Sequence, residues 1–251
     1  MNLSLVVITL NEEENIGRCL DSVPIASEMI VVDSGSTDST IAIAEKYGVK
    51  VLSHVFESFS RQKQWAIEQA SGDWVLSLDA DESLDTELSN ELESLLENDT
   101  EHVAFRLPFR ILYMGKLLRF GPWSGEYHTR IFRKGSAHFP DTGVHEGLLI
   151  NCGTIGTVKR GFVVHRSYDS LSDQMEKMLR YSRLWAEEEH QKKRKSNILQ
   201  ILLRPSWRFI SAYFFRGGIL EGVPGLAASA ISAFYVFLKW AMLFEMSISD
   251  R

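Results

Sequence analysis

The first third of the chain alternates short apolar runs with segments of helical spacing, and this alternation constrains the fold most strongly. The apolar runs predict strands at residues 3–9, 29–32, 49–53 and 74–78. Helices are expected between them, the first with Ile16, Cys19 and Leu20 on one face. Repeated strand–helix alternation is typical of a mostly parallel, doubly wound α/β sheet.

Three of these predicted strands end in polar residues. They are Thr9, Asn11 and Glu12 after the first, Asp33 in the loop at residues 33–38 after the second, and Asp79-Ala80-Asp81-Glu82 after the last. The carboxyl ends of parallel strands meet at one edge, where open α/β sheets bind ligands. Oxygen acceptors there suit a nucleotide, and carboxylates suit a hard cation shared with phosphates.

The stretch at residues 79–82 has a second interpretation, because acidic residues also favour the first turn of a helix. Its position as the last of three polar strand ends favours the metal site. The first strand is followed by neither a Gly-x-Gly-x-x-Gly motif nor a Walker-type lysine. We therefore expect a metal ion, together with Lys63, to meet the charge of a bound diphosphate.

The order and spacing of these motifs over residues 3–165 resemble the family-2 glycosyltransferases of the GT-A fold. Members of that family transfer sugars from nucleotide-diphospho-sugars with inversion. Within the family, the chain is most similar to the branch of lipopolysaccharide-core β-1,4-glucosyltransferases. Residues 62–66, 79–82 and 143–146 carry that similarity.

The resemblance implies a nucleotide site. Asp33 would contact the nucleobase, and Thr9, Asn11 and Glu12 would line the same pocket. Two departures affect it: Asp33-Ser34 stands where many members have two acids, and Lys63-Gln64 stands where many have Arg-Asn. A lysine is a point charge and cannot grip a phosphate through two bonds as arginine does.

The resemblance also implies a site for Mg²⁺ or Mn²⁺. Asp81 would ligate the ion, and Asp79 would lie near both ribose and metal. His165 would complete the metal shell from a later strand, although a single histidine is more often structural. Glu82 would lie behind the ligands or start a helix.

The acceptor hydroxyl must lose a proton, and a positioned base contributes about 10²–10⁴-fold. Asp141, His145 and Glu146 are the candidates. We expect Glu146 to be the base and His145 to position it or the acceptor, with a half-buried structural histidine as the alternative. Trp123 and Tyr127 would either stack on a sugar or belong to the core.

Composition limits the partners. The net charge of −6 argues against nucleic acid, and two cysteines fit a reducing cytoplasm. The apolar N-terminus is too short for a secretory leader and is expected to be a core strand.

Residues 170–195 predict a polar helix. Residues 198–246 are rich in aromatics and arginine, which suit the headgroup level of a membrane. The uncharged run Val223–Leu238, which Lys239 ends, is shorter than the ~20 residues that a spanning helix needs.

We therefore predict a GT-A domain at residues 1–168, divided into a nucleotide-sugar half (1–100) and an acceptor half (101–168). Residues 169–251 would form a helical C-terminal region that contacts either a membrane or a second subunit. The enzyme would be cytoplasmic and peripheral on the cytoplasmic face of the inner membrane.

The predicted reaction is metal-assisted, inverting transfer of a hexose, with glucose suggested by the branch, to a lipid-linked saccharide such as the lipopolysaccharide core. A sugar-phosphate nucleotidyltransferase is one alternative, but it expects a basic Gly-rich loop where residues 11–14 are Asn-Glu-Glu-Glu. A non-catalytic sugar-binding scaffold is another, and the intact Asp79 and Asp81 pair argues against it.

Overall fold

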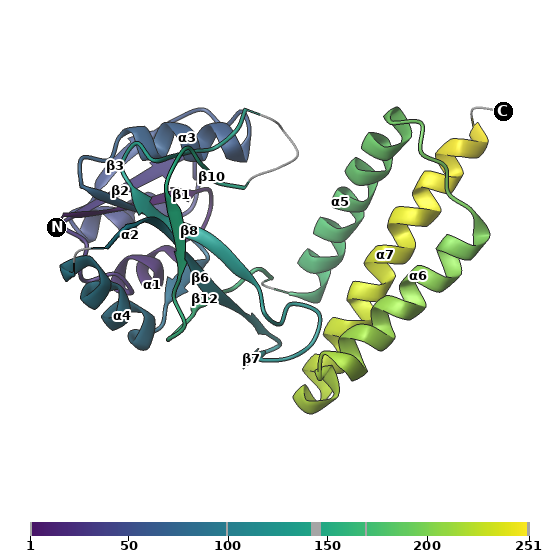
Figure 1. The fold of residues 1–251 in the computed structure, drawn as a ribbon. Coiled ribbons are helices and arrows are strands. Elements are labelled where there is room, and N and C mark those ends of the chain that lie inside the picture. Colours follow the sequence, from purple (N-terminus) through teal and green to yellow (C-terminus); the bar gives the residue numbers. More distant parts are fainter. Residues whose placement is uncertain (1, 99, 142–146, 169, 250–251) are drawn as a thin grey trace. The chain divides into compact units, whose positions relative to one another are not determined.

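The computed structural model describes residues 2–98, 100–141, 147–168 and 170–249 (Figure 1). Its contacts divide the chain into two units. The N-terminal unit comprises Met1–Phe109 and Gly125–His165, and the C-terminal unit comprises Arg110–Ser124 and Arg166–Arg251. Residues 110–124, which lie inside the domain expected at 1–168, are thus grouped with the C-terminal helices.

The N-terminal unit is built on a mixed sheet. The strands of the unit are β1 (Leu3–Thr9), β2 (Glu28–Asp33), β3 (Lys50–Ser53), β4 (Trp74–Asp79), β5 (Glu82–Leu84), most of β6 (His102–Tyr113), β8 (Tyr127–Arg133), β9 (Ala137–His138), β10 (Leu149–Ile150), β11 (Thr154–Thr157) and β12 (Val163–His165). Strands β9 and β10 pair with each other in a separate two-stranded sheet. The main sheet has the order β3-β2-β1-β4-β8-β6-β12-β5. The first four strands are parallel, and β8 runs antiparallel to both β4 and β6. The predicted α/β architecture is confirmed.

Helices cover both faces of the parallel strands. They are α1 (Ile16–Asp21), α2 (Thr40–Lys46), α3 (Phe59–Glu68) and α4 (Thr86–Glu97). Leu5 and Val7 of β1 belong to a core cluster that includes residues of α1 and α2, whereas Val6 belongs to one that includes residues of α3. Alternate side chains of a strand point to opposite faces. The apolar runs are continuous because both faces are buried.

The C-terminal unit consists mainly of three helices. They are α5 (Leu171–Gln191), α6 (Ile198–Ile210) and α7 (Val223–Ser249), with a π-helical turn at Ser211–Phe215 and a 3₁₀ turn at Gly218–Glu221. Within this unit, α5 and α6 both pack along α7 (Figure 1). Ala186, Trp240 and Leu243 form the buried centre of that packing. The predicted helical, apolar C-terminal extension is confirmed.

Lys239 ends the uncharged run Val223–Leu238, but helix α7 continues through it to Ser249 and is therefore longer than that run. The Lys239 Nζ lies 4.7 Å from the ring centroid of Trp185 and 4.8 Å from that of Tyr235. Aromatic faces attract cations, so the helix accommodates this charge. As a result α7 is long and apolar enough to cross a membrane, judged by length and composition alone.

Glu221 explains why residues 110–124 are grouped with the helices. Its buried carboxylate forms an ion pair of 2.7 Å with Lys116 and accepts hydrogen bonds from the backbone N–H groups of Arg119 and Phe120. Strand β7 contains only Lys116–Leu117. The Leu118 N–H still donates to the Ile111 carbonyl of β6, and beyond it the N–H groups of Arg119 and Phe120 bind the Glu221 carboxylate.

Candidate active site

The strand register brings the three polar clusters to one edge of the sheet. Thr9, at the end of β1, is paired with Asp33, at the end of β2. On the other side of β1, Ile8 is paired with Asp79, the last residue of β4. The expected convergence of the strand ends at the carboxyl edge is therefore present.

The Asp33 carboxylate organises the loop that follows β2. It accepts hydrogen bonds from the backbone N–H groups of Gly35 (2.8 Å) and Ser36 (2.9 Å) and from the Ser36 hydroxyl (2.5 Å). Gly35 has a φ of +100°, a conformation that favours glycine. Asp33 is buried, and these three bonds fix the shape of the loop at the edge.

The loop after β1 is tied to the loop after β2. The Asn11 side chain accepts a hydrogen bond of 2.8 Å from the backbone N–H of Thr37. The backbone N–H of Glu12 donates to the Thr40 hydroxyl at 2.7 Å. Thr9 Oγ1 is buried and has no hydrogen-bond partner within the described residues. An orphaned buried hydroxyl at a ligand-binding edge is a free polar group for a bound molecule.

Asp79 is held by two cations. Lys63 of α3 is buried and its Nζ lies 2.8 Å from Asp79 Oδ1, and Arg130 of β8 lies 3.3 Å from Asp79 Oδ2. Burial alone would raise the pKa of Asp79, but the charges of Lys63 and Arg130 lower it well below its usual range. Lys63, expected to meet phosphate, is thus engaged with the neighbouring carboxylate.

Glu82 is a buried partner of Arg130. The guanidinium lies 2.5 Å from Glu82 Oε1, while Glu82 Oε2 accepts a 3.1 Å hydrogen bond from the backbone N–H of Asp79. Glu82 begins strand β5, so the helix start considered for it is wrong. It is held there by antiparallel pairing of β5 with β12, in which Glu82 faces His165. Burial raises the pKa of Glu82, and Arg130 opposes that rise.

Arg130 was not expected at the site from its sequence context. A local signal was available, because Arg130 stands directly before the apolar pair Ile131 and Phe132. A cation at a half-buried strand position needs an anionic partner. The acidic stretch at residues 79–82 was the nearest concentration of anions at the predicted site.

Asp81 and His165 are brought together by the same strand pairing. His165 Nε2 lies 3.2 Å from Asp81 Oδ2. Burial alone would lower the pKa of His165, but the hydrogen bond that the imidazole donates to Asp81, together with the surrounding carboxylates, raises it. The two residues named as metal ligands from the sequence are therefore neighbours, although 84 positions separate them in the chain.

These donors fit a divalent cation. A carboxylate and an imidazole both suit Mn²⁺, and Mg²⁺ is commonly held by one or two carboxylates with substrate phosphates and water. Within the described residues, no group of three or more His, Cys, Asp or Glu is arranged to hold a metal. The remaining ligands would therefore come from a diphosphate and from water.

Of the base candidates, the structure describes only Asp141. Arg61 of α3 binds both of its oxygens, at 2.6 Å from Nε and 2.9 Å from Nη2. Arg61 lowers the pKa of Asp141, which makes this carboxylate a weaker base. His145 and Glu146 lie outside the described residues.

The two aromatic candidates differ in their surroundings. Trp123, in the C-terminal unit, packs against Tyr113 and Tyr168, with ring centroids 5.4 and 6.1 Å away. Tyr127, in the N-terminal unit, is 44% exposed. Trp123 therefore belongs to a local aromatic cluster, whereas Tyr127 presents its ring to solvent.

Comparison with known proteins identifies the family. The model of glycosyl transferase family 2 matches residues 4–145. The lipopolysaccharide core biosynthesis glycosyltransferase LpsC of Rhizobium meliloti is 29% identical over 97% of this chain and 92% of its own length. An uncharacterized glycosyltransferase of Rickettsia typhi is 33% identical over 99% of this chain and 89% of its own length.

A solved structure supports the fold. Residues 1–349 of TarS from Staphylococcus aureus, in complex with UDP, align with a TM-score of 0.51 at 18% identity. That alignment covers 100% of this chain and 92% of the TarS chain. The family match over more than half of the sequence agrees with the GT-A arrangement of the parallel strands. The chain belongs to glycosyl transferase family 2 and is a glycosyltransferase of the GT-A fold.

Proposed function

We propose that this glycosyltransferase moves a hexose, most simply glucose, from a nucleotide-diphospho-sugar to a lipid-linked saccharide with inversion. The acceptor we propose is the lipopolysaccharide core, because LpsC, which is similar over nearly the whole chain, carries that role in its name. The reaction would take place on the cytoplasmic face of the inner membrane, where such an acceptor is embedded.

The pairing of Asp81 with His165 is the observation that carries this proposal. It sets a carboxylate and an imidazole 3.2 Å apart at the carboxyl edge of the sheet, beside Asp79. That edge is where α/β sheets bind nucleotides. Asp81 and His165 would hold Mg²⁺ or Mn²⁺ there, and the bound ion would act as a Lewis acid toward the leaving diphosphate.

The remaining residues would position the donor. Thr9, Asn11, Glu12 and Asp33 would form the nucleoside side of the pocket, with the Asp33 loop already fixed by its own hydrogen bonds. Lys63 and Arg130 would keep Asp79 ionised and in place, so its carboxylate could accept bonds from the ribose or approach the metal.

Glu146 is the proposed base that takes the proton from the acceptor hydroxyl. His145 is proposed to position Glu146 or the acceptor. Asp141 is the weaker candidate, because its bidentate pair with Arg61 stabilises the anion and opposes protonation.

Activity on a panel of nucleotide-sugars tests the proposal. Full-length protein would be incubated with each sugar donor, lipopolysaccharide core acceptor and Mg²⁺ or Mn²⁺, and release of the nucleoside diphosphate followed. Acceptor-dependent release from a hexose donor is expected. Release of pyrophosphate from a nucleoside triphosphate and a sugar phosphate would instead support the nucleotidyltransferase alternative.

The scaffold alternative needs a separate comparison. Asp81→Asn removes the proposed ligand with little change in size, whereas Glu93→Gln neutralises an exposed carboxylate on α4 as a matched control. Loss of turnover in Asp81→Asn alone supports catalysis at this edge. Binding of donor with no turnover under any of these conditions would favour a non-catalytic scaffold.

A further inference from the structure

Helix α6 presents an apolar strip that the fold leaves uncovered. None of its side chains is buried, and Leu199, Leu203 and Trp207 are 61%, 62% and 62% exposed. Past the helix, Phe215 is 73% exposed and its ring centroid lies 5.8 Å from that of Trp207, and Leu220 is 69% exposed. Exposed apolar patches of this extent mark interaction sites with proteins or membranes.

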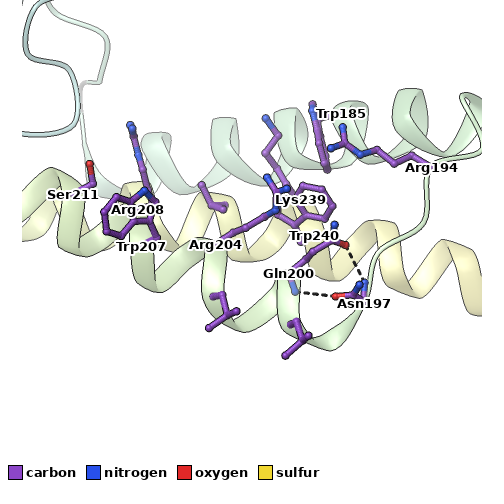
Figure 2. Close-up of a pocket in the computed structure, with 13 residues that line it drawn as sticks. Trp185, Arg194, Asn197, Gln200, Arg204, Trp207, Arg208, Ser211, Lys239 and Trp240 are labelled. Carbon is purple, nitrogen blue, oxygen red and sulfur yellow. Dashed lines mark hydrogen bonds between the residues drawn. The ribbon is translucent and has the colours of Figure 1, made fainter.

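A cavity of about 800 Å³ lies beside this strip, within the C-terminal unit (Figure 2). Trp185, Trp207 and Trp240 line it together with Arg194, Arg204 and Lys239. Figure 2 shows Arg204 reaching from α6 toward Trp240 of α7, and its guanidinium lies 4.2 Å from that ring centroid. Aromatic rings and cations therefore share one recess.

Among the residues that the structure describes, two of these cations, Arg204 and Lys239, form no ion pair within 4.0 Å. The contacts of Arg204 and Lys239 are with aromatic rings. Burial lowers the pKa of Lys239, and the charges of Glu189 and Glu188 only partly offset that effect. Arg194, in contrast, is paired with Glu189. An anionic group entering the recess would supply the missing charge.

The charge distribution selects the kind of partner. Residues 192–249 carry eight Lys and Arg against two Glu, whereas residues 1–191 carry 18 Lys and Arg against 30 Asp and Glu. The acidic remainder would be repelled by an anionic surface while the basic region is attracted. A second copy of this chain is a poorer partner, because a two-fold contact would set the same cations against each other.

We infer that α6 docks on anionic phospholipid, with its apolar strip in the acyl boundary and a headgroup phosphate in the recess formed by Arg204 and Lys239. Amphipathic helices with basic residues and exposed Trp and Leu bind in this way. Helix α7 stays packed, since Trp240 and Leu243 are buried within the three-helix unit. The contact is peripheral. It rests on the membrane location proposed above and assigns that contact to the exposed face of α6 and its recess.

Vesicle co-sedimentation tests this inference without depending on the transfer reaction. Full-length protein would be mixed with vesicles of phosphatidylcholine alone or with added phosphatidylglycerol, over a range of salt concentrations. We expect binding at least tenfold stronger to the anionic vesicles, weakening as salt rises. Equal binding to both vesicle types, or none to either, would overturn the inference.

Matched variants locate the surface. Arg204→Gln with Lys239→Met removes two charges from the recess, and Lys46→Gln with Lys50→Gln removes two exposed charges from the N-terminal unit. Each cation near an anionic surface contributes about 1 kcal/mol of binding free energy, so the first pair should weaken binding roughly thirtyfold, and the control pair should not. Equal binding by the two variants would contradict the assignment.

Leu199→Gln with Leu203→Gln tests the apolar strip separately. We expect weaker binding to anionic vesicles, with the circular dichroism spectrum and melting temperature retained because both side chains are exposed. If sizing shows a dimer that this variant dissociates, and vesicles do not bind, the strip joins two copies and the lipid inference is wrong.

Discussion

The Arg130 guanidinium lies 2.5 Å from the carboxylate of Glu82, a residue 48 positions earlier in the chain. The same guanidinium reaches Asp79, and the Glu82 carboxylate accepts the backbone N–H of Asp79. Arg130 therefore joins strand β8 to the two ends of the acidic stretch that carries Asp81. This link holds Asp79 and Glu82, the residues on either side of the proposed metal ligand Asp81, in place.

Removing Arg130 should destabilise the protein. Arg130→Met leaves the buried Glu82 without its cation, and breaking one side of a buried ion pair costs about 3–5 kcal/mol. Urea unfolding measures the loss. Adding Glu82→Gln to Arg130→Met should recover part of it, because the uncompensated charge is then gone. A change in unfolding free energy below about 1 kcal/mol in the single variant would contradict the role of Arg130.

Glu221 should stabilise the C-terminal unit in a pH-dependent way. Burial alone would raise the pKa of Glu221, but Lys116 and two backbone N–H groups lower it. Its stabilisation is therefore present above the unfolded value of about 4.3 and is lost as the pH falls through the lower folded value. Glu221→Gln should cost about 1–3 kcal/mol at pH 7.

The pH series gives the control for Glu221. Unfolding free energies of wild type and Glu221→Gln, measured from pH 7 downward, should converge in acid. A difference that grew toward low pH would have the wrong sign and would refute the ionised, ion-paired carboxylate.

The two cysteines should differ sharply in reactivity. Cys19 is buried, and its burial, followed by the charges of Glu82 and nearby acids, raises the pKa of its thiol. Cys152 is exposed. Because the thiolate is the nucleophile, Ellman's reagent should label Cys152 rapidly and Cys19 only after unfolding. Rapid labelling of native Cys152→Ser would show that Cys19 is accessible.

The base assignment predicts unequal effects of two isosteric changes. Glu146→Gln should lower kcat by about 10²–10⁴-fold, the usual contribution of a positioned base. Asp141→Asn should change kcat much less, because Arg61 already holds that carboxylate in its ionised form. Steady-state kinetics on both variants decide the matter, and the reverse order of effects would make Asp141 the base.

Local patterns predicted the parallel half of the fold well. The strand ending at Asp79 and the helix containing Lys63 follow from periodicity, and the convergence of polar strand ends follows from parallel pairing. Contacts between distant segments were harder to predict. The Asp81 and His165 pair was reached through the family resemblance, because strand pairing between β5 and β12 has no local signature. Glu221 was missed for the same reason, whereas Arg130 had a local signal, its place directly before Ile131 and Phe132, that was not used.

Manganese binding tests the central claim most directly. Binding of Mn²⁺ to the full-length protein in the presence of a nucleoside diphosphate can be followed by electron paramagnetic resonance, without any turnover. Asp81→Asn should weaken this binding at least tenfold, and Glu93→Gln should leave it unchanged. Equal Mn²⁺ affinity in wild type and Asp81→Asn would contradict the assignment of Asp81 as the metal ligand.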